Sequence, residues 1–192
     1  MANSSINKTR KLCETAIMLA LATALSYVTI FKLPMGGSIT LFSQVPIIII
    51  GYRYGAKWGI STGIIYGILQ MLLQGLGNFA YVKGFVAYLI LILADYVLAF
   101  MSLGLGGAMF KKAVKNQTVA LALGAFFGSL LRFICHFVSG VTIWGEYVWG
   151  YSASYNGSYM AVEAALSVLA VVVLSLVLDF SKENLRKTKK AE

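Results

Sequence analysis

Four ionisable side chains lie inside long apolar stretches of this sequence: Asp95, Arg132, His136 and Glu163. Burying such groups in a bilayer is unfavourable, so each is expected to face a partner or a water-filled cavity. Arg132 and His136 are four residues apart, which puts them on one face of a helix. Asp95 has no basic residue nearby in its own stretch. Its carboxylate therefore requires a cation or a hydrogen-bond donor from another segment of the chain or from a ligand.

The same residues also have simpler interpretations. A structural ion pair, or snorkelling of the side chains to the membrane surface, is the preferred interpretation for Arg132 and Glu163. His136 on its own could be an ordinary buried histidine. Asp95 is the strongest indication of a binding site, since no simple structural role accounts for it.

Residues 143–160, "IWGEYVWGYSASYNGSYM", hold two tryptophans and four tyrosines between two apolar stretches. Such rings often form a belt at the membrane surface. A belt requires neither the glycines, Glu146 and Asn156 of this segment nor charges in the neighbouring spans. Aromatic rings beside a carboxylate favour a flat cationic ligand, because cation–π attraction in a desolvated site can reach about 2 kcal/mol. The free compound is favoured over phosphate esters, which would need more basic residues than Arg132 and Lys83.

Catalytic interpretations find little support in the sequence. Cys135 and His136 are neighbours and point about 100° apart on a helix, so they cannot form a nucleophile and base pair. The patterns HExxH and GxxxxGK[ST] do not occur. Cys13 and Cys135 have neither disulfide nor metal-ligand spacing. We therefore expect no catalytic residue, no metal and no cofactor.

The composition indicates an integral membrane protein. Hydrophobic residues make up 59% of the 192 residues and charged residues 12%, and the mean hydropathy is +0.79. A transmembrane β-barrel would need strands of about ten residues in which apolar and polar residues alternate, and the apolar stretches here are longer and do not alternate. We expect an all-α, compact bundle of six transmembrane helices in one membrane domain, residues 1–192, with a basic tail at 181–192. The expected spans are residues 12–31, 39–52, 58–75, 84–110, 118–139 and 159–180, with Pro46 kinking the partly buried second one.

Lys and Arg residues determine the expected orientation. Thirteen of the sixteen fall on one side of this arrangement, in the N-terminal segment, the second and fourth connections and the tail. Because cytoplasmic loops retain Lys and Arg, both termini are expected to be cytoplasmic. The net charge of +9 then fits contact with anionic lipids of the bilayer and requires no nucleic acid. Asp95, Arg132, His136 and Glu163 are expected to lie in the outer half of the membrane, near the aromatic segment.

Three segments carry a resemblance to a known family: "HFVSGVTIWGEYVWGYSASYNGSYM", "LADYVLAFMSLGLGGAMF" and "RYGAKWGISTGIIYGILQ". The chain resembles the ThiT family, the thiamine-binding S-components of energy-coupling factor (ECF) vitamin transporters, over about residues 12–180. The resemblance implies six helices, cytoplasmic termini, a prokaryotic cell membrane and a thiamine site that opens outward.

The resemblance also implies roles for individual residues. His136 and Trp144 match the pocket histidine and the stacking tryptophan of the family, and Tyr151 and Asn156 match the pair that binds the aminopyrimidine. Asp95 replaces the pocket carboxylate, which can be glutamate in the family. A tryptophan of the first outer loop in family members is replaced here by Met35-Gly36-Gly37, so Gly37 borders the site. We expect one of three rings to take the place of that tryptophan as a wall of the site: Tyr147, Trp149 or Tyr155.

The first span adds an expected partner surface. Ala16, Ala20 and Ala24 recur every four residues and form a smooth stripe suited to close helix packing. In the family a comparable motif docks the shared transmembrane coupling subunit, which acts with two ATPase subunits. Packing within the chain is the alternative role of the stripe. The alternative functions are an S-component for another flat vitamin, such as riboflavin, and a small membrane-embedded enzyme.

Overall fold

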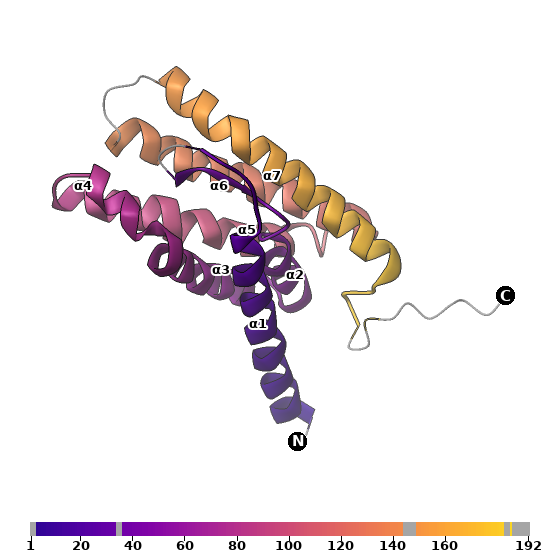
Figure 1. The fold of residues 1–192 in the computed structure, drawn as a ribbon. Coiled ribbons are helices and arrows are strands. Elements are labelled where there is room, and N and C mark those ends of the chain that lie inside the picture. The colour runs from indigo at the N-terminus through magenta and orange to yellow at the C-terminus, as the bar shows by residue number, and fades with distance from the viewer. Residues whose placement is uncertain (1–2, 34–35, 144–148, 183–184, 186–192) are drawn as a thin grey trace.

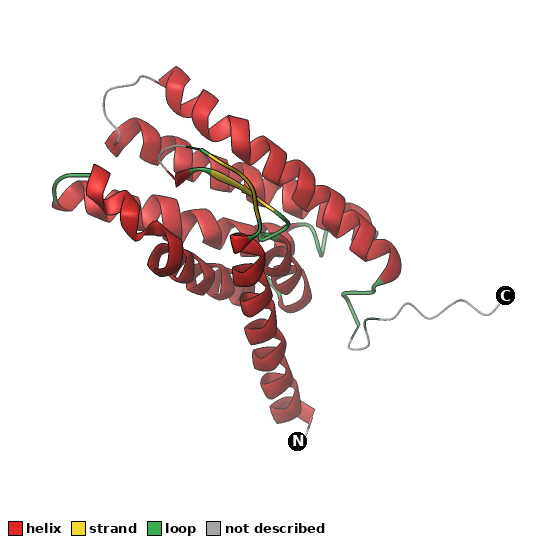
Figure 2. Cartoon of the chain, in the orientation of Figure 1, coloured by secondary structure: helices red, strands yellow, loops and turns green. Residues whose placement is uncertain are grey.

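The computed structural model describes residues 3–33, 36–143, 149–182 and 185. Helices make up most of this part of the chain, and one short antiparallel hairpin completes it (Figures 1 and 2). The elements are α1 (Asn3–Tyr27), β1 (Thr29–Lys32), β2 (Ser38–Thr40), α2 (Val45–Tyr54), α3 (Ala56–Gln70), the π-helix η2 (Met71–Gly75), the 3-10 helix η3 (Leu76–Tyr81), α4 (Phe85–Ile90), the π-helix η4 (Leu91–Leu98), α5 (Ala99–Met109), α6 (Gln117–Ile143) and α7 (Trp149–Val177).

Four helical segments of the described chain are long and apolar enough to cross a membrane: residues 56–81, 85–109, 117–143 and 149–177. They correspond to the last four predicted spans. The first of them runs from α3 through η2 and η3 without a break in the chain, and the second from α4 through η4 to α5. α1 and the ten-residue α2 do not meet the same criteria of length and hydropathy.

The first two predicted spans are partly wrong. Residues 29–31 and 39–40, which we assigned to helices, belong to β1 and β2, with Thr29 paired to Thr40 and Lys32 to Ser38. The β-branched residues of both segments favour strands. Gly36 at the turn adopts φ +91°, a conformation that glycine tolerates without strain. A β-hairpin therefore stands where the sequence suggested the end of one helix and the start of the next.

Pro46 does not kink the second helix. It lies in the first turn of α2, where its fixed φ fits the helix and its missing N–H is not needed. Residues 45–52 are all buried, so α2 is more deeply enclosed than the partly buried helix that we predicted. It contacts α3 and α5 most extensively.

Glycines bring α2, α3 and α5 into backbone contact. A Cβ on Gly104 would lie 1.9 Å from the carbonyl oxygen of Gly59, and one on Gly51 would lie 2.0 Å from the carbonyl oxygen of Gly104. Real Cβ atoms do not approach backbone atoms so closely. The three helices therefore form a tight unit, in which small residues allow close packing of the kind common in membrane bundles.

The sixth predicted span begins ten residues too late. Residues 149–158 were expected in a connection, yet they form the first turns of α7, which starts at Trp149. No proline interrupts this segment, and α6 supplies an adjacent helix against which it packs. Two thirds of the aromatic segment, residues 149–160, thereby lie in α7. Glu163 consequently lies almost four turns into α7 and not one turn from its start.

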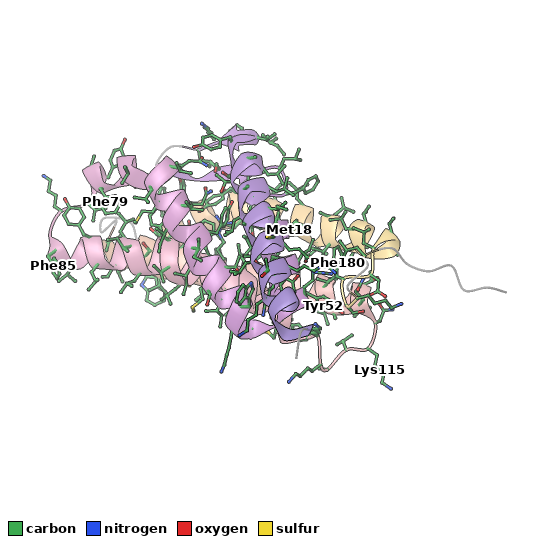
Figure 3. All side chains as sticks on the ribbon, turned by 90° about the horizontal axis from the view of Figure 1, so that it is seen from below. Met18, Tyr52, Phe79, Phe85, Lys115 and Phe180 are labelled. Carbon is green, nitrogen blue, oxygen red and sulfur yellow. The ribbon has the colours of Figure 1, made fainter. Side chains whose placement is uncertain are left out.

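α1 crosses the bundle at a steep angle and projects beyond it at its N-terminal end (Figure 1). Arg53 of α2 holds it through an ion pair to Glu14 at 3.0 Å, and the indole of Trp58 donates to Thr15 Oγ1 at 2.8 Å. Figure 3 shows Phe79 and Phe85 at one end of the bundle and Lys115 toward the opposite end.

Candidate ligand-binding site

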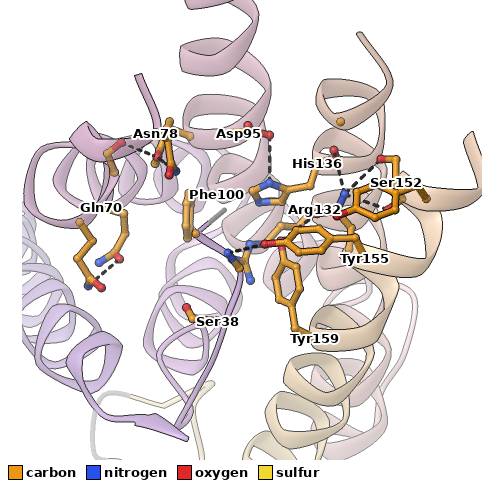
Figure 4. A pocket seen from close by; sticks show the side chains of 18 residues that line it. Ser38, Gln70, Asn78, Asp95, Phe100, Arg132, His136, Ser152, Tyr155 and Tyr159 are labelled. Carbon is orange, nitrogen blue, oxygen red and sulfur yellow. Dashed lines mark hydrogen bonds and ion pairs between the residues drawn. The ribbon is translucent and has the colours of Figure 1, made fainter. Parts of the chain in front are cut away.

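A pocket lies where the tip of the β-hairpin meets α3, η2, η4, α6 and α7 (Figure 4). Five sequence-distant segments contribute its lining: Gly36, Gly37 and Ser38; Gln70, Gln74, Gly75 and Asn78; Asp95, Tyr96 and Phe100; Arg132, His136 and Gly140; and Tyr151, Ser152, Tyr155, Asn156 and Tyr159. The mixture of rings, amides and ionisable groups is typical of a pocket that orients a small polar molecule.

Asp95 and His136 form a pair in the wall of this pocket. Nδ1 of His136 lies 3.0 Å from Oδ1 of Asp95, and Ser139 donates to Oδ2 at 2.8 Å. The first contact is close but lacks hydrogen-bond alignment, so Oδ1 accepts no hydrogen bond from the described residues. Nε2 of His136 is also buried without such a partner. Buried polar atoms without a hydrogen-bond partner require an explanation, and here both belong to side chains that line the pocket.

The π-helix η4 places Asp95 and Tyr96 in the pocket. Its wider turn adds a residue relative to an α-helix and shifts the faces that successive side chains occupy, a feature common at functional sites. Tyr96 is buried, accepts a hydrogen bond from Asn78 at 3.0 Å and donates to the carbonyl oxygen of Gly75 at 3.3 Å. The bulge is therefore anchored to η2 and η3 on the other side of the pocket.

One face of α7 supplies much of the remaining lining. Tyr151, Tyr155 and Tyr159 are spaced by four residues and therefore project from the same side of the helix. The rings of Tyr151 and Tyr155 stack at 6.1 Å between centroids. Asn156 lies beside them: its Nδ2 donates to the Ser152 carbonyl at 3.1 Å, and its Oδ1 accepts from Tyr159 at 3.0 Å. This face offers flat surfaces together with a fixed amide.

The hairpin tip rests on the α7 face through Gly37. Its backbone N–H donates to the hydroxyl of Tyr155 at 3.0 Å. A Cβ at this position would lie 2.7 Å from the same hydroxyl and 3.0 Å from the ring of Tyr159. Only glycine permits this contact, so Gly37 lets the hairpin reach the pocket.

Glu163 fastens the base of the hairpin to the bundle. It accepts hydrogen bonds from the backbone and the hydroxyl of Thr40 at 2.9 and 2.6 Å, from Gln44 at 2.7 Å and from Arg132 at 2.6 Å. The structure confirms the predicted Arg132–Glu163 ion pair, and the side chains are only 10% and 3% exposed. The Arg132 guanidinium also lies 4.9 Å from the centre of the Phe100 ring. Arg132 thus lines the pocket with its charge already compensated.

The structure brings together most of the predicted ligand-binding residues. Asp95, His136, Tyr151, Asn156 and Gly37 all line the pocket, and Tyr155, one of the three rings proposed for the missing wall, lines it as well. Trp149 does not: it is 67% exposed and meets the edge of Phe137 outside the pocket. Trp144 and Tyr147 lie outside the described residues.

Sequence reasoning missed the amide side of the pocket, which Gln70, Gln74 and Asn78 form. A signal was available, because Gln70 and Gln74 are four residues apart inside an apolar stretch and so share a helix face. Uncharged amides in a predicted span draw less attention than ionisable groups, although they also require partners in a membrane.

Comparison with known proteins identifies the family. Residues 12–182 match the family described as thiamine transporter protein (Thia_YuaJ). The chain belongs to the thiamine transporter family. Two relatives carry the name thiamine transporter ThiT. The protein from Bacillus subtilis (strain 168) is 32% identical over 180 residues, covering 85% of this chain and 89% of its own. That from Lacticaseibacillus paracasei (strain ATCC 334) is 31% identical over 175 residues, covering 84% of each.

A solved structure supports the fold of this family member. ThiT from Listeria monocytogenes superposes with a TM-score of 0.70 at 23% identity, covering 88% of this chain and 95% of that one. The family consists of transporters and not of enzymes. With several helices able to cross a bilayer, this thiamine transporter family member is a multi-pass protein of the cell membrane.

Proposed function

We propose that this chain binds thiamine with high affinity in the described pocket, as the substrate-binding S-component of an ECF transporter. The observation that carries the proposal is the Asp95–His136 pair, whose atoms Oδ1 and Nε2 lack hydrogen-bond partners among the described residues and border a pocket rich in tyrosines. Thiamine combines a cationic ring with an aminopyrimidine. Such a molecule complements a carboxylate, stacked rings and amides.

Within this proposal, each half of thiamine has its own partners. Asp95 compensates the thiazolium charge from the wall, and the stacked rings of Tyr151 and Tyr155 offer the flat surface. Asn156 and the Tyr151 hydroxyl bind the aminopyrimidine, as the resemblance to the family implies, and His136 lies beside Asp95 in the wall. The pairing of Arg132 with Glu163 leaves little positive charge for a phosphate group, which favours free thiamine.

The pocket faces the outside of the cell in this proposal, and both termini are cytoplasmic. Lys111, Lys112 and Lys115 lie in the connection before α6, and Figure 3 shows Lys115 toward the end opposite Phe79 and Phe85. By the distribution of basic residues, that connection is the cytoplasmic one. α1 and α2 complete a six-helix membrane domain together with the four long segments.

The coupling to energy requires partners in trans, since the chain carries no nucleotide-binding loop. Ala16, Ala20 and Ala24 are all exposed on α1, so the alternative of packing within the chain is not supported. The stripe is instead open to a helix of the transmembrane coupling subunit, which works with two ATPase subunits. Thiamine capture, closure of the hairpin and reorientation of the bundle upon ATP hydrolysis then follow in sequence.

A binding titration tests this function. Purified protein in detergent is titrated with thiamine while its tryptophan fluorescence is recorded, and the mixture is analysed for products by chromatography. We expect saturable quenching with one thiamine per chain and unchanged thiamine afterwards. Riboflavin should not compete. Displacement by riboflavin would favour the other vitamin, and turnover of thiamine would indicate a membrane-embedded enzyme.

A further inference from the structure

Two glutamines form the side of the pocket that faces away from α7. Gln70 ends α3, and Gln74 lies one turn later in η2. Gln70 is 9% exposed, whereas Gln74 is exposed at the rim. Figure 4 shows Gln70 across the pocket from Ser152 and Tyr155, with Asp95 and His136 between them. An elongated ligand held at the α7 end therefore directs its other end toward these amides.

The hydrogen bonds of Ser26 fix the orientation of both amides. The single hydroxyl proton of Ser26 is donated to the carbonyl oxygen of Thr23 at 2.7 Å. Its oxygen can then only accept, and it accepts from Nε2 of Gln70 at 3.1 Å and from Nε2 of Gln74 at 2.7 Å. Both amide nitrogens must point toward Ser26, which is itself 3% exposed on α1.

A second bond restricts what Gln74 can offer. Its Nε2 also donates to Oε1 of Gln70 at 3.2 Å, so both of its N–H groups are used. Among the hydrogen bonds of the described residues, the Gln74 carbonyl oxygen and one N–H of Gln70 have no partner. The pair thus presents one acceptor and one donor side by side. A hydroxyl group, which both donates and accepts, is the ligand group that satisfies both.

We propose that Gln70 and Gln74 bind the terminal hydroxyl of the ligand's side arm and thereby select the free alcohol over its phosphate esters. This inference rests on the proposed function, since thiamine carries a hydroxyethyl arm on the ring opposite its aminopyrimidine. A phosphate ester has no proton for the Gln74 carbonyl, and its negative charge meets a carbonyl oxygen there. Arg132 does not offset this repulsion, because its guanidinium is paired with Glu163 at 2.6 Å.

The test combines a ligand change with a protein change. Thiamine and an analogue with an ethyl in place of the hydroxyethyl arm are titrated against the wild-type chain and Gln74→Leu. Wild-type protein should bind the analogue at least about two- to tenfold more weakly than thiamine, since that is the range of a single neutral hydrogen bond and the hydroxyl makes two. Gln74→Leu should bind thiamine about two- to tenfold more weakly and should distinguish the two ligands less than wild type does, because only the Gln70 N–H remains to contact the hydroxyl.

Gln117→Leu is the matched control, because Gln117 bonds to Leu178 and Phe180 far from the pocket. It should retain the wild-type ratio of affinities. The inference is overturned if wild-type protein does not distinguish the ligands, or if Gln74→Leu keeps the wild-type ratio of affinities. If the proposed function is wrong, wild-type protein will bind neither ligand. That result would contradict both proposals and differs from the two results above.

Discussion

Replacing Glu163 by glutamine tests how the hairpin is held over the pocket. The carboxylate receives four donors, from Thr40, Gln44 and Arg132, and is almost completely buried. Glutamine has nearly the same shape but turns one acceptor into a donor. It thereby leaves the Arg132 guanidinium without its counter-charge and sets an N–H group against at least one of the remaining donors.

The magnitude follows from the burial of the pair. Removing one partner of a buried ion pair costs about 3–5 kcal/mol, because the remaining charge stays buried and uncompensated. In a chain of this size each kcal/mol lowers the melting temperature by about 2–4 °C. We therefore expect the Glu163→Gln protein to melt about 6–20 °C below wild type, with the hairpin detached earlier than the helices.

Thermal unfolding in detergent, followed by circular dichroism, measures the loss. Limited proteolysis at increasing temperature reports on the hairpin. Lys182→Gln is the control, because Lys182 pairs with Asp179 at 3.3 Å but is 59% exposed, and such pairs contribute little. Equal melting temperatures for Glu163→Gln and wild type would refute the buried network as the anchor of the hairpin.

Three further changes probe other parts of the structure. Gly104→Ala should lower the melting temperature and the yield of folded protein, because its Cβ would lie 1.9 Å from a backbone oxygen, whereas Gly77→Ala, with nothing within 4 Å, should match wild type. Tyr155→Phe removes the acceptor for Gly37 N–H and should increase the thiamine dissociation rate about two- to tenfold in stopped-flow fluorescence. An unchanged rate would show that this contact does not help to retain the ligand. Ala20→Leu alters an exposed helix position and should leave thiamine binding intact while preventing co-purification with the ECF subunits, and an intact complex would exclude the stripe as the docking surface.

The membrane class and the late helices could be predicted because their signals are local. Hydropathy alone located the segments 85–109 and 117–143 to within a few residues. The hairpin at 29–40 could not be found in this way, since apolar β-branched residues fit a span as well as a strand. Its stability comes from contacts such as Thr40 to Glu163, 123 residues apart. Hydropathy and periodicity are evaluated over short segments and therefore cannot predict contacts between residues so far apart in the sequence.

The candidate site shows the same division. Asp95, Arg132 and His136 were identifiable because charge in a membrane span requires compensation. Gln70 and Gln74 carry no charge, and their importance depends on a serine of α1 that fixes their orientation. Trp149 was expected at the pocket by its ring alone. The start of α7 at this residue turns the indole outward, where it is exposed.

The thiamine affinity of Asp95→Asn, compared with wild type by tryptophan fluorescence, tests the central claim most directly. Asparagine preserves the size of the side chain and can still accept from Ser139, but it removes the negative charge beside His136. Loss of one charge-assisted contact, about 1.5–3 kcal/mol, predicts a dissociation constant at least tenfold higher. A folded Asp95→Asn protein that binds thiamine as tightly as wild type would contradict a carboxylate that holds the cation.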